Sequence, residues 1–159
     1  MKKTDIINDN YSGKWDRSRV ACRGIIIDGS QILLSYETAK DQWLIPGGGK
    51  EDDESDKECC IREVLEETGM IVEVGECLVE INQYFDSFRH TNRYFVAKVI
   101  KEAEMKLTER EKGIGVTSRW ISVEKALAIF SGYKIYEKSD PERCGLYQRE
   151  YTALMEIVR

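Results

Sequence analysis

The sequence predicts an α/β fold in which a mixed β-sheet lies between helices. Two observations indicate this class: short apolar or β-branched stretches recur along the chain, and segments with helical spacing interrupt them. A length of 159 residues is that of one ordinary domain with a sizeable core. We therefore expect residues 1–159 to form a single domain.

The first third of the chain predicts three short strands. Residues Val20–Ile27 and Gln31–Tyr36 are mainly apolar or β-branched, and the turn-forming residues Asp28–Ser30 between them predict a β-hairpin. Trp43–Ile45 is a third strand, which ends at Pro46 and the glycine run that follows it.

A helix is expected over Asp56–Thr68, with Gly69 as the residue that ends it. Ser55 is the expected N-cap, and Glu58 three residues later completes a capping-box pattern. At about 100° per residue, one side of this helix is apolar and is expected to pack on the sheet. That side consists of Cys60, Ile61, Val64, Leu65 and Thr68.

The remainder of the chain predicts more strands, at Ile71–Ile81, Tyr84–Phe88, Arg93–Ile100 and Trp120–Ile121. Ser122 is the expected N-cap of a helix that runs to about Phe130. Helical spacing of apolar and aromatic residues predicts a last helix over Tyr147–Val158.

Composition excludes several classes of function. The net charge of −5 and a pI near 5.1 argue against a nucleic-acid-binding surface, which normally has a basic face. Residues Met1–Tyr11 lack the apolar stretch of a signal peptide, and no apolar run approaches the length of a bilayer span. We expect a cytoplasmic protein without a membrane partner.

The five cysteines form no C-x-x-C pair, and His90 is the single histidine, so a structural zinc site is disfavoured. We expect reduced thiols that serve as small core residues. A catalytic cysteine is the less favoured alternative, because only His90 could be its base. We expect His90 to lie in a loop and to have no catalytic task.

Three carboxylates stand on one side of the predicted helix. Glu63, Glu66 and Glu67 are spaced i, i+3 and i+4, where like charges repel by a few tenths of a kcal/mol per pair. A solvated helix face is one explanation. Bound divalent cations are the other, because Mg²⁺ prefers carboxylate oxygens, and the preceding Gly47–Gly49 run lets backbone approach a ligand closely.

The full spacing decides between these explanations. The segment resembles the signature of the Nudix hydrolase family, G-x5-E-x7-R-E-U-x-E-E-x-G-U, where U is apolar; Val64 and Met70 fill the apolar positions. Seven matches at ordinary residue frequencies have a chance of about one in a hundred million per starting position. The fixed positions are Gly48, Glu54, Arg62, Glu63, Glu66, Glu67 and Gly69.

The resemblance implies the family's α/β/α sandwich, and the WLIPGG approach to the loop and the downstream RWISVEKAL agree with it. One departure is Asp53, where many members have glycine. Asp tolerates a positive φ better than most residues, so we do not expect inactivation.

The resemblance also implies roles for the signature residues. Glu63, Glu66 and Glu67 would bind Mg²⁺ or Mn²⁺, with the carbonyl of Gly48 as a further ligand. Arg62 and Glu54 would form a structural pair, and water would attack a phosphorus of an X–O–P–O–P group. In this family the general base often lies outside the signature helix, on a loop before a late strand, or is a glutamate of the helix itself. Glu109 and Glu111, in the expected loop before Trp120, are the candidates here, with Glu111 favoured.

The expected partner is a nucleotide-like small molecule. Arg23 and Lys50 are the favoured phosphate-binding cations, with Arg89 and Arg93 as alternatives. Aromatic residues that could stack on a base are Trp43, Tyr84, Phe85 and Phe88.

Within the family, residues outside the signature distinguish one substrate class from another. The proline of the ADP-ribose class is missing between Pro46 and Pro141, and Tyr84 is off the spacing of the dinucleoside polyphosphate class. By elimination we expect a nucleoside triphosphate or a related nucleoside diphosphate derivative.

Two other functions remain open at this point. One is a non-catalytic nucleotide sensor, although such domains commonly lose the glutamates retained here. The other is an isomerase of the isopentenyl diphosphate type, which the intact signature disfavours. The oligomeric state is also open, with a homodimer as one alternative.

Overall fold

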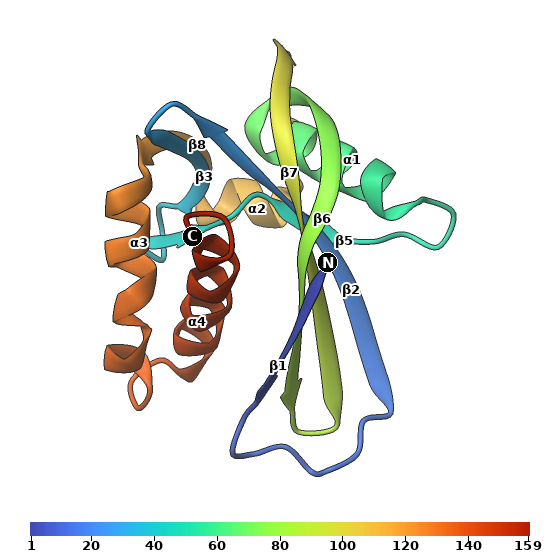
Figure 1. The fold of residues 1–159 in the computed structure, drawn as a ribbon, viewed down its shortest axis with the longest axis vertical. Helices are drawn as coiled ribbons and strands as arrows, with labels where there is room; N and C mark the ends of the chain where they lie inside the picture. Colours follow the sequence, from blue (N-terminus) through green and yellow to red (C-terminus); the bar gives the residue numbers. More distant parts are fainter.

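The computed structural model describes residues 1–159 and confirms a mixed α/β sheet with helices on both faces (Figure 1). In the long part of the sheet, β1 and β6 pair in parallel, β6 and β7 antiparallel, and β7 and β2 in parallel. β3 follows β2, β4 and β8 both pair with β3, and β5 pairs with β2, all antiparallel. The strands are β1 (Lys2–Ile7), β2 (Arg17–Asp28), β3 (Gln31–Glu37), β4 (Gln42–Leu44), β5 (Gly47–Gly49), β6 (Met70–Phe85), β7 (Phe88–Glu102) and β8 (Val116–Ser122).

The helices divide between the two faces, with α1 on one side and α3 and α4 on the other (Figure 1). Each face has its own apolar core, one around Val64 and Phe95 and one around Phe130 and Tyr94. None of the helices is both long and apolar enough to cross a membrane. The helices are α1 (Asp56–Thr68), α2 (Glu109–Ile114), α3 (Val123–Ser131), the 3₁₀ helix η1 (Gly132–Tyr136) and α4 (Pro141–Met155).

The predicted hairpin of the first two strands is confirmed. Asp28 of β2 pairs with Gln31 of β3, and Gly29 in the turn has φ of 59°, a left-handed conformation that glycine takes without strain. The hairpin carries Ile25, Ile26 and the Leu33–Leu34 pair into the two cores, which fixes the position of β2 under both layers of helices.

Helix α1 begins and ends where the sequence predicts. The Ser55 hydroxyl accepts a hydrogen bond from Glu58 N at 3.2 Å, and Ser55 N donates to Glu58 Oε2 at 2.7 Å, so the capping box is complete. Gly69 has φ of 73° and donates its N–H to the carbonyl of Leu65, which closes the last turn.

The buried side of α1 differs in part from the predicted one. Cys60, Val64 and Thr68 are buried as expected, but Ile61 is 36 % exposed and Cys59 is fully buried. The sheet therefore contacts the helix along a line rotated toward Cys59, because β5 packs beside the first turns of α1 as well as β2 and β6 behind it.

The predicted strand over Tyr84–Phe88 is wrong. β6 continues to Phe85, and Asp86 and Ser87 form the turn into β7, with Asp86 at φ of 50°. The apolar pattern of Tyr84, Phe85 and Phe88 comes from the two ends of one hairpin, where the rings of Phe85 and Phe88 lie 5.2 Å apart. An aspartate at the left-handed position gives no glycine signal for the turn.

Other boundaries also differ from the predicted ones. α4 begins at Pro141, six residues before the predicted start, because Asp140 caps it and proline suits the first helical turn. Residues 2–7 form β1 although their short, charged sequence predicts no strand. α3 begins after Ser122 as predicted, with the Ser122 hydroxyl accepting from Lys125 N.

The five cysteines are all free thiols, as expected. Cys22, Cys59 and Cys60 are fully buried and serve as small core residues. Cys77 and Cys144 are half-buried.

Replacing Ser55 with alanine is expected to lower the free energy of unfolding by about 1 kcal/mol, because Glu58 N loses its acceptor. Chemical denaturation followed by circular dichroism measures the change. Ser139→Ala, at an exposed turn, is the control and should leave stability within about 0.5 kcal/mol of the parent protein. Equal stability of the two variants would show that the cap contributes nothing.

Candidate active site

The glycine run and helix α1 meet at a very close contact between Gly48 and Glu63. A Cβ atom at Gly48 would lie 2.3 Å from Glu63 Oε2, well inside the distance at which atoms clash. β5 is held there by its pairing with Ala21, Cys22 and Arg23 of β2. Glycine at position 48 is therefore required so that the Glu63 carboxylate can lie directly against the backbone.

Arg62 ties the loop to the helix. Its guanidinium donates to both carboxylate oxygens of Glu54, Nε to Oε2 at 2.9 Å and Nη2 to Oε1 at 2.6 Å, and Nη2 also donates to the Gly49 carbonyl at 3.0 Å. This bidentate contact lowers the pKa of Glu54 to about 2. The structure thus places Arg62 and Glu54 in the direct contact that the resemblance implies.

Two of the three signature glutamates face the same guanidinium. Arg62 Nη1 lies 2.7 Å from Glu63 Oε1 and 3.4 Å from Glu66 Oε2. Burial raises the pKa of Glu63, and the hydrogen bond from Arg62 opposes that rise. The guanidinium thus offsets the repulsion between the two carboxylates.

Glu67 is buried rather than solvated. Only 7 % of it is exposed, and Oε2 accepts hydrogen bonds from Ser35 Oγ at 3.0 Å and from Gly47 N at 3.2 Å. Burial raises its pKa to about 8, while the charge of Arg23 opposes the rise. Glu67 is therefore not part of a solvated helix face; it packs against Ser35 and the start of β5.

No group of three His, Cys, Asp or Glu side chains is arranged to hold a metal ion. Glu63 and Glu66 are directed to Arg62, and Glu67 is directed to Ser35 and Gly47. The donor set itself consists of hard carboxylate oxygens beside a backbone that is open at Gly48, which suits Mg²⁺ or Mn²⁺ in its chemistry.

Glu111 does not lie in a loop. It is the third residue of α2, and its Oε1 accepts the N–H of Thr108 at 2.9 Å in a second capping box. Its charge is still close enough to Glu63 to contribute to that residue's raised pKa. Glu109 pairs with Lys112 on the exposed side of α2.

The four candidate cations have different partners. Arg23 is buried beside Glu67 and donates from Nε to Asn92 Oδ1 and from Nη1 to the Ile45 carbonyl. Lys50 lies 2.8 Å from Asp56, as does Arg93, on the side of the sheet that carries α1. Of these cations, Arg23 alone is brought next to a signature glutamate.

Arg89 and the aromatic candidates pack against other side chains away from the glutamates. Arg89 lies 4.2 Å over the ring of Trp15, and Trp43 packs on Tyr36 with ring centroids 4.5 Å apart. Tyr84 lies against Tyr11 near the turn of the β6–β7 hairpin.

Residues 17–141 match the family model of the NUDIX domain. This chain belongs to the Nudix family. Diphosphoinositol polyphosphate phosphohydrolase 3-alpha of Mus musculus is 31 % identical over 103 residues, which are 65 % of this chain and 61 % of the relative. The 3-beta protein of Bos taurus is 30 % identical over 105 residues, with the same coverage. The chain thus spans about three fifths of the length of these curated Nudix relatives.

Solved Nudix structures share the fold. A NUDIX hydrolase from Nitrosomonas europaea superimposes with a TM-score of 0.60 at 22 % identity, covering 70 % of this chain and 77 % of its own. An ADP-ribose pyrophosphatase from Streptococcus suis has a TM-score of 0.56 at 19 % identity, covering 89 % of this chain and 92 % of its own. These likenesses confirm the predicted Nudix fold.

The departure at Asp53 causes no strain. The non-glycine residues with positive φ are Asp41 and Asp86, so Asp53 has an ordinary backbone conformation in this Nudix loop.

Two residues beside the signature of this Nudix domain were not predicted from the sequence. Ser35 of β3 holds Glu67, and Arg19 of β2 lies against Gly49, where a Cβ would be 2.8 Å from its Nη2. The alternation of Arg19, Ala21 and Arg23 along β2 is a signal that could have found Arg19, because residues two apart in a strand share a face.

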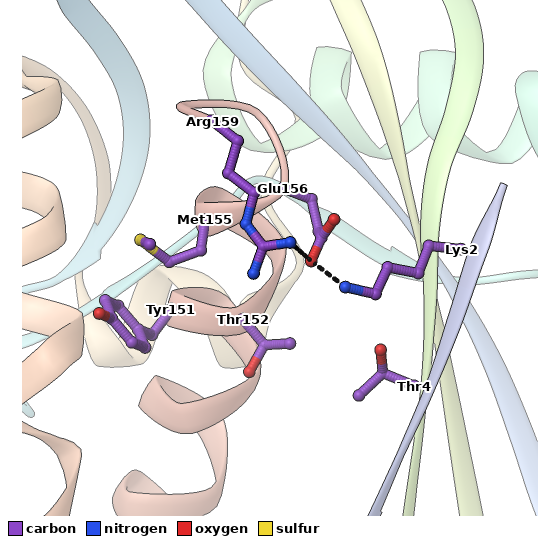
Figure 2. A pocket seen from close by; sticks show the side chains of 7 residues that line it. All are labelled: Lys2, Thr4, Tyr151, Thr152, Met155, Glu156 and Arg159. Carbon is purple, nitrogen blue, oxygen red and sulfur yellow. Dashed lines mark hydrogen bonds and ion pairs between the residues drawn. The ribbon is translucent and has the colours of Figure 1, made fainter.

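A pocket lies elsewhere on the molecule, between β1 and the C-terminal end of α4 (Figure 2). Its charged residues pair with one another: Glu156 lies 2.6 Å from Lys2 and 3.8 Å from Arg159. None of the signature residues lines it, so it is not a candidate for the active site.

His90 lies in β7, contrary to the expectation of a loop, between Arg19 of β2 and Gln83 of β6. Its Nε2 is buried and has no hydrogen-bond partner. Burial lowers its pKa to about 3, and the positive charges of Arg149, Arg23 and Arg19 act in the same direction. His90 is therefore uncharged at neutral pH.

Acidification is expected to destabilise the protein through His90. The unfolded chain protonates this residue below a pH of about 6.5, whereas the folded protein does so only near 3. The free energy of unfolding therefore falls as pH drops through this window, by at most about 2 kcal/mol between pH 7.5 and 5. Thermal denaturation of His90→Gln beside the parent protein should show the smaller loss in the variant. Parallel pH profiles would contradict the assignment, because the chain has no other histidine.

Proposed function

We propose that this chain is a Mg²⁺-dependent Nudix hydrolase that cleaves the diphosphate linkage of a nucleoside diphosphate attached to another moiety. Nucleoside triphosphates are the preferred substrates within this proposal. The observation that carries it is the contact of Gly48 with Glu63, made within a signature that retains all seven fixed residues. Family membership and the phosphohydrolase names of the relatives support the reaction class.

The signature glutamates fit a divalent cation. Burial raises the pKa of Glu67 and of Glu63, so both carboxylates would gain from a positive charge beside them. Glu63 and Glu66 would exchange Arg62 for the ion, and the Gly48 carbonyl would supply a further oxygen. Bound Mg²⁺ neutralises phosphate charge and lowers the pKa of the attacking water.

The residues of the chain have separate tasks in this mechanism. Arg62, held by Glu54 and the Gly49 carbonyl, keeps the glutamate side of α1 in register with the loop. We assign Glu111 as the general base that accepts a proton from the attacking water. The water oxygen bonds to phosphorus, the bridging P–O bond breaks, and the proton passes on to the leaving phosphate. Arg23 and Lys50 would contact the phosphates, for which Lys50 must leave Asp56.

An assay of purified protein with Mg²⁺ tests the proposal. Nucleoside triphosphates, dinucleoside polyphosphates, ADP-ribose and nucleotide sugars are offered separately, and products are identified by chromatography. Glu66→Gln is expected to lower kcat about a hundredfold or more, because a charged ligand becomes neutral. Glu73→Gln, an exposed glutamate of β6, is the matched control and should keep full activity. Metal-dependent nucleotide binding without turnover would instead establish the sensor.

The assignment of Glu111 has its own test. Glu111→Gln is expected to lower kcat at least tenfold at neutral pH, within the range for loss of a general base. Its Mg²⁺ affinity should be unchanged, because the residue is not a metal ligand. Glu109→Gln, on the exposed side of the same helix, is the control. Full kcat in Glu111→Gln with metal still bound would end this assignment.

A further inference from the structure

One face of the β2–β7–β6 sheet carries a group of cationic and amide side chains. Along β2, Arg19, Ala21 and Arg23 alternate onto this face, and the paired positions of β7 are His90 beside Arg19 and Asn92 beside Ala21. Ala21, which has only a methyl group and is fully buried, lies between the two arginines along the strand. Arg23 Nε donates to Asn92 Oδ1 at 2.8 Å, which fixes its position over the sheet.

A third arginine reaches the same face from α4. Arg149 is 4 % exposed, and its Nη1 donates to Oε1 of Gln83, the residue paired with His90 on β6. Its Nε donates to Glu150 and to the Tyr94 hydroxyl, so Nη2 takes no part in these bonds. We call Arg19, Arg23, Arg149, His90 and Asn92 the arginine cluster.

Two buried polar atoms of the arginine cluster lack partners. Asn92 is fully buried, and its Nδ2 has no acceptor. The hydrogen bond from Arg23 Nε fixes the orientation of this amide, because Oδ1 must be the acceptor and Nδ2 is then the free donor. His90 Nε2 is likewise buried and unpaired. An unsatisfied buried donor costs about 1–3 kcal/mol, so an acceptor oxygen placed beside Asn92 Nδ2 would gain a hydrogen bond there.

Two carboxylates, Glu67 and Glu150, lie near the three arginines of the cluster. Arg19 and Arg23 form no salt bridge, and Glu150 is the carboxylate paired with Arg149. Glu150 is also committed to the Ile45 N–H and the Tyr94 hydroxyl. Glu67 beside Arg23 belongs to the proposed metal site. Three guanidinium groups, two buried and that of Arg19 exposed, outnumber these two carboxylates, which favours an anion with several acceptor oxygens.

The arginine cluster borders the proposed reaction centre directly. The arginine side chains lie on two of the three glycines of the loop: a Cβ would be 2.6 Å from Arg23 Cγ at Gly47 and 2.8 Å from Arg19 Nη2 at Gly49. Gly48 between them faces Glu63 on the other side of β5. A substrate whose diphosphate reaches the glutamates can therefore extend over β5 onto the arginines.

Resting on the proposed hydrolase function, we infer that the arginine cluster binds a further phosphate group of the substrate, beyond the two that flank the scissile bond. The substrate class is then a diphosphate that bears an additional anionic phosphate, either the third phosphate of a nucleoside triphosphate or a phosphate on a polyol ring. A diphosphate joined to a neutral sugar reaches Arg23 but leaves Arg19 and Arg149 without a phosphate, and is a poor substrate.

The test compares three substrates with Mg²⁺: ATP, a diphosphoinositol polyphosphate and UDP-glucose. Arg19→Gln is the informative variant, because Arg19 has no protein partner whose loss would unfold the chain. It should lower kcat/KM for the phosphate-bearing substrates about tenfold to a hundredfold, mainly through KM. Activity on UDP-glucose should change less than twofold. Turnover of ATP or of the inositol compound identifies the source of the extra phosphate.

Arg17→Gln is the matched control. Arg17 lies on the same strand and face, but it stacks on Phe88 and pairs with Asp16 outside the arginine cluster. It should change kcat/KM less than twofold for every substrate. The inference is wrong when the parent protein prefers UDP-glucose, or when Arg19→Gln lowers activity on all three substrates equally or on none.

A binding measurement separates this inference from the proposed hydrolysis. Inorganic tripolyphosphate is titrated calorimetrically in EDTA into the parent protein, Glu66→Gln and Arg19→Gln. We expect equal affinity in the first two and at least tenfold weaker binding in Arg19→Gln. That result without turnover of any substrate would contradict the proposed hydrolase function and support the anion site. Absence of binding, or equal affinity in all three proteins, would contradict the inference of an anion site.

Discussion

The contact between the Gly48 backbone and the Glu63 carboxylate is the constraint on which the rest of this structure depends. It requires β5 and α1 to approach more closely than any side chain at position 48 would permit. The capping box at Ser55 fixes where α1 starts, and Arg62 fixes its rotation by binding Glu54 and the Gly49 carbonyl together. A local close approach thus sets the register between a strand and a helix that are adjacent in sequence.

The glycine loop separates an acidic side chain on one side from basic side chains on the other. On one side Gly48 lies against Glu63; on the other, Gly47 and Gly49 lie under Arg23 and Arg19. A side chain is therefore excluded at Gly48 by an acidic neighbour, and at Gly47 and Gly49 by basic neighbours. A diphosphate with an extra phosphate needs both sides, because a metal site attracts its scissile group and cations attract the remainder.

Buried charge accompanies this arrangement. Glu67, Arg149 and Glu150 are all nearly inaccessible to solvent, and each carries several hydrogen bonds that offset part of the cost of burial. Glu150 and Arg149 connect α4 to Tyr94 of the sheet, so the C-terminal helix also orients the guanidinium that reaches Gln83. A buried ion pair of this kind adds little net stability, because the cost of desolvation offsets the attraction between its charges.

Local interactions explain what the sequence alone determined. The bounds of α1, its caps at Ser55 and Gly69, the hairpin around Gly29 and the Nudix signature all depend on residues within a few positions of one another. The pairing of Arg62 with Glu54 was also predictable, because a helix and the loop before it bring these positions together.

Only the tertiary structure decided which side chains from distant segments share one face. The burial of Glu67 depends on Ser35, thirty-two residues away, and the arginine cluster combines strands β2 and β7 with helix α4. The turn at Asp86 and the strand at residues 2–7 likewise follow from pairing with distant strands rather than from local preference. Strand register and the packing of α4 are long-range choices, so no local pattern encodes them, whereas caps and signature spacing are local and can be read directly.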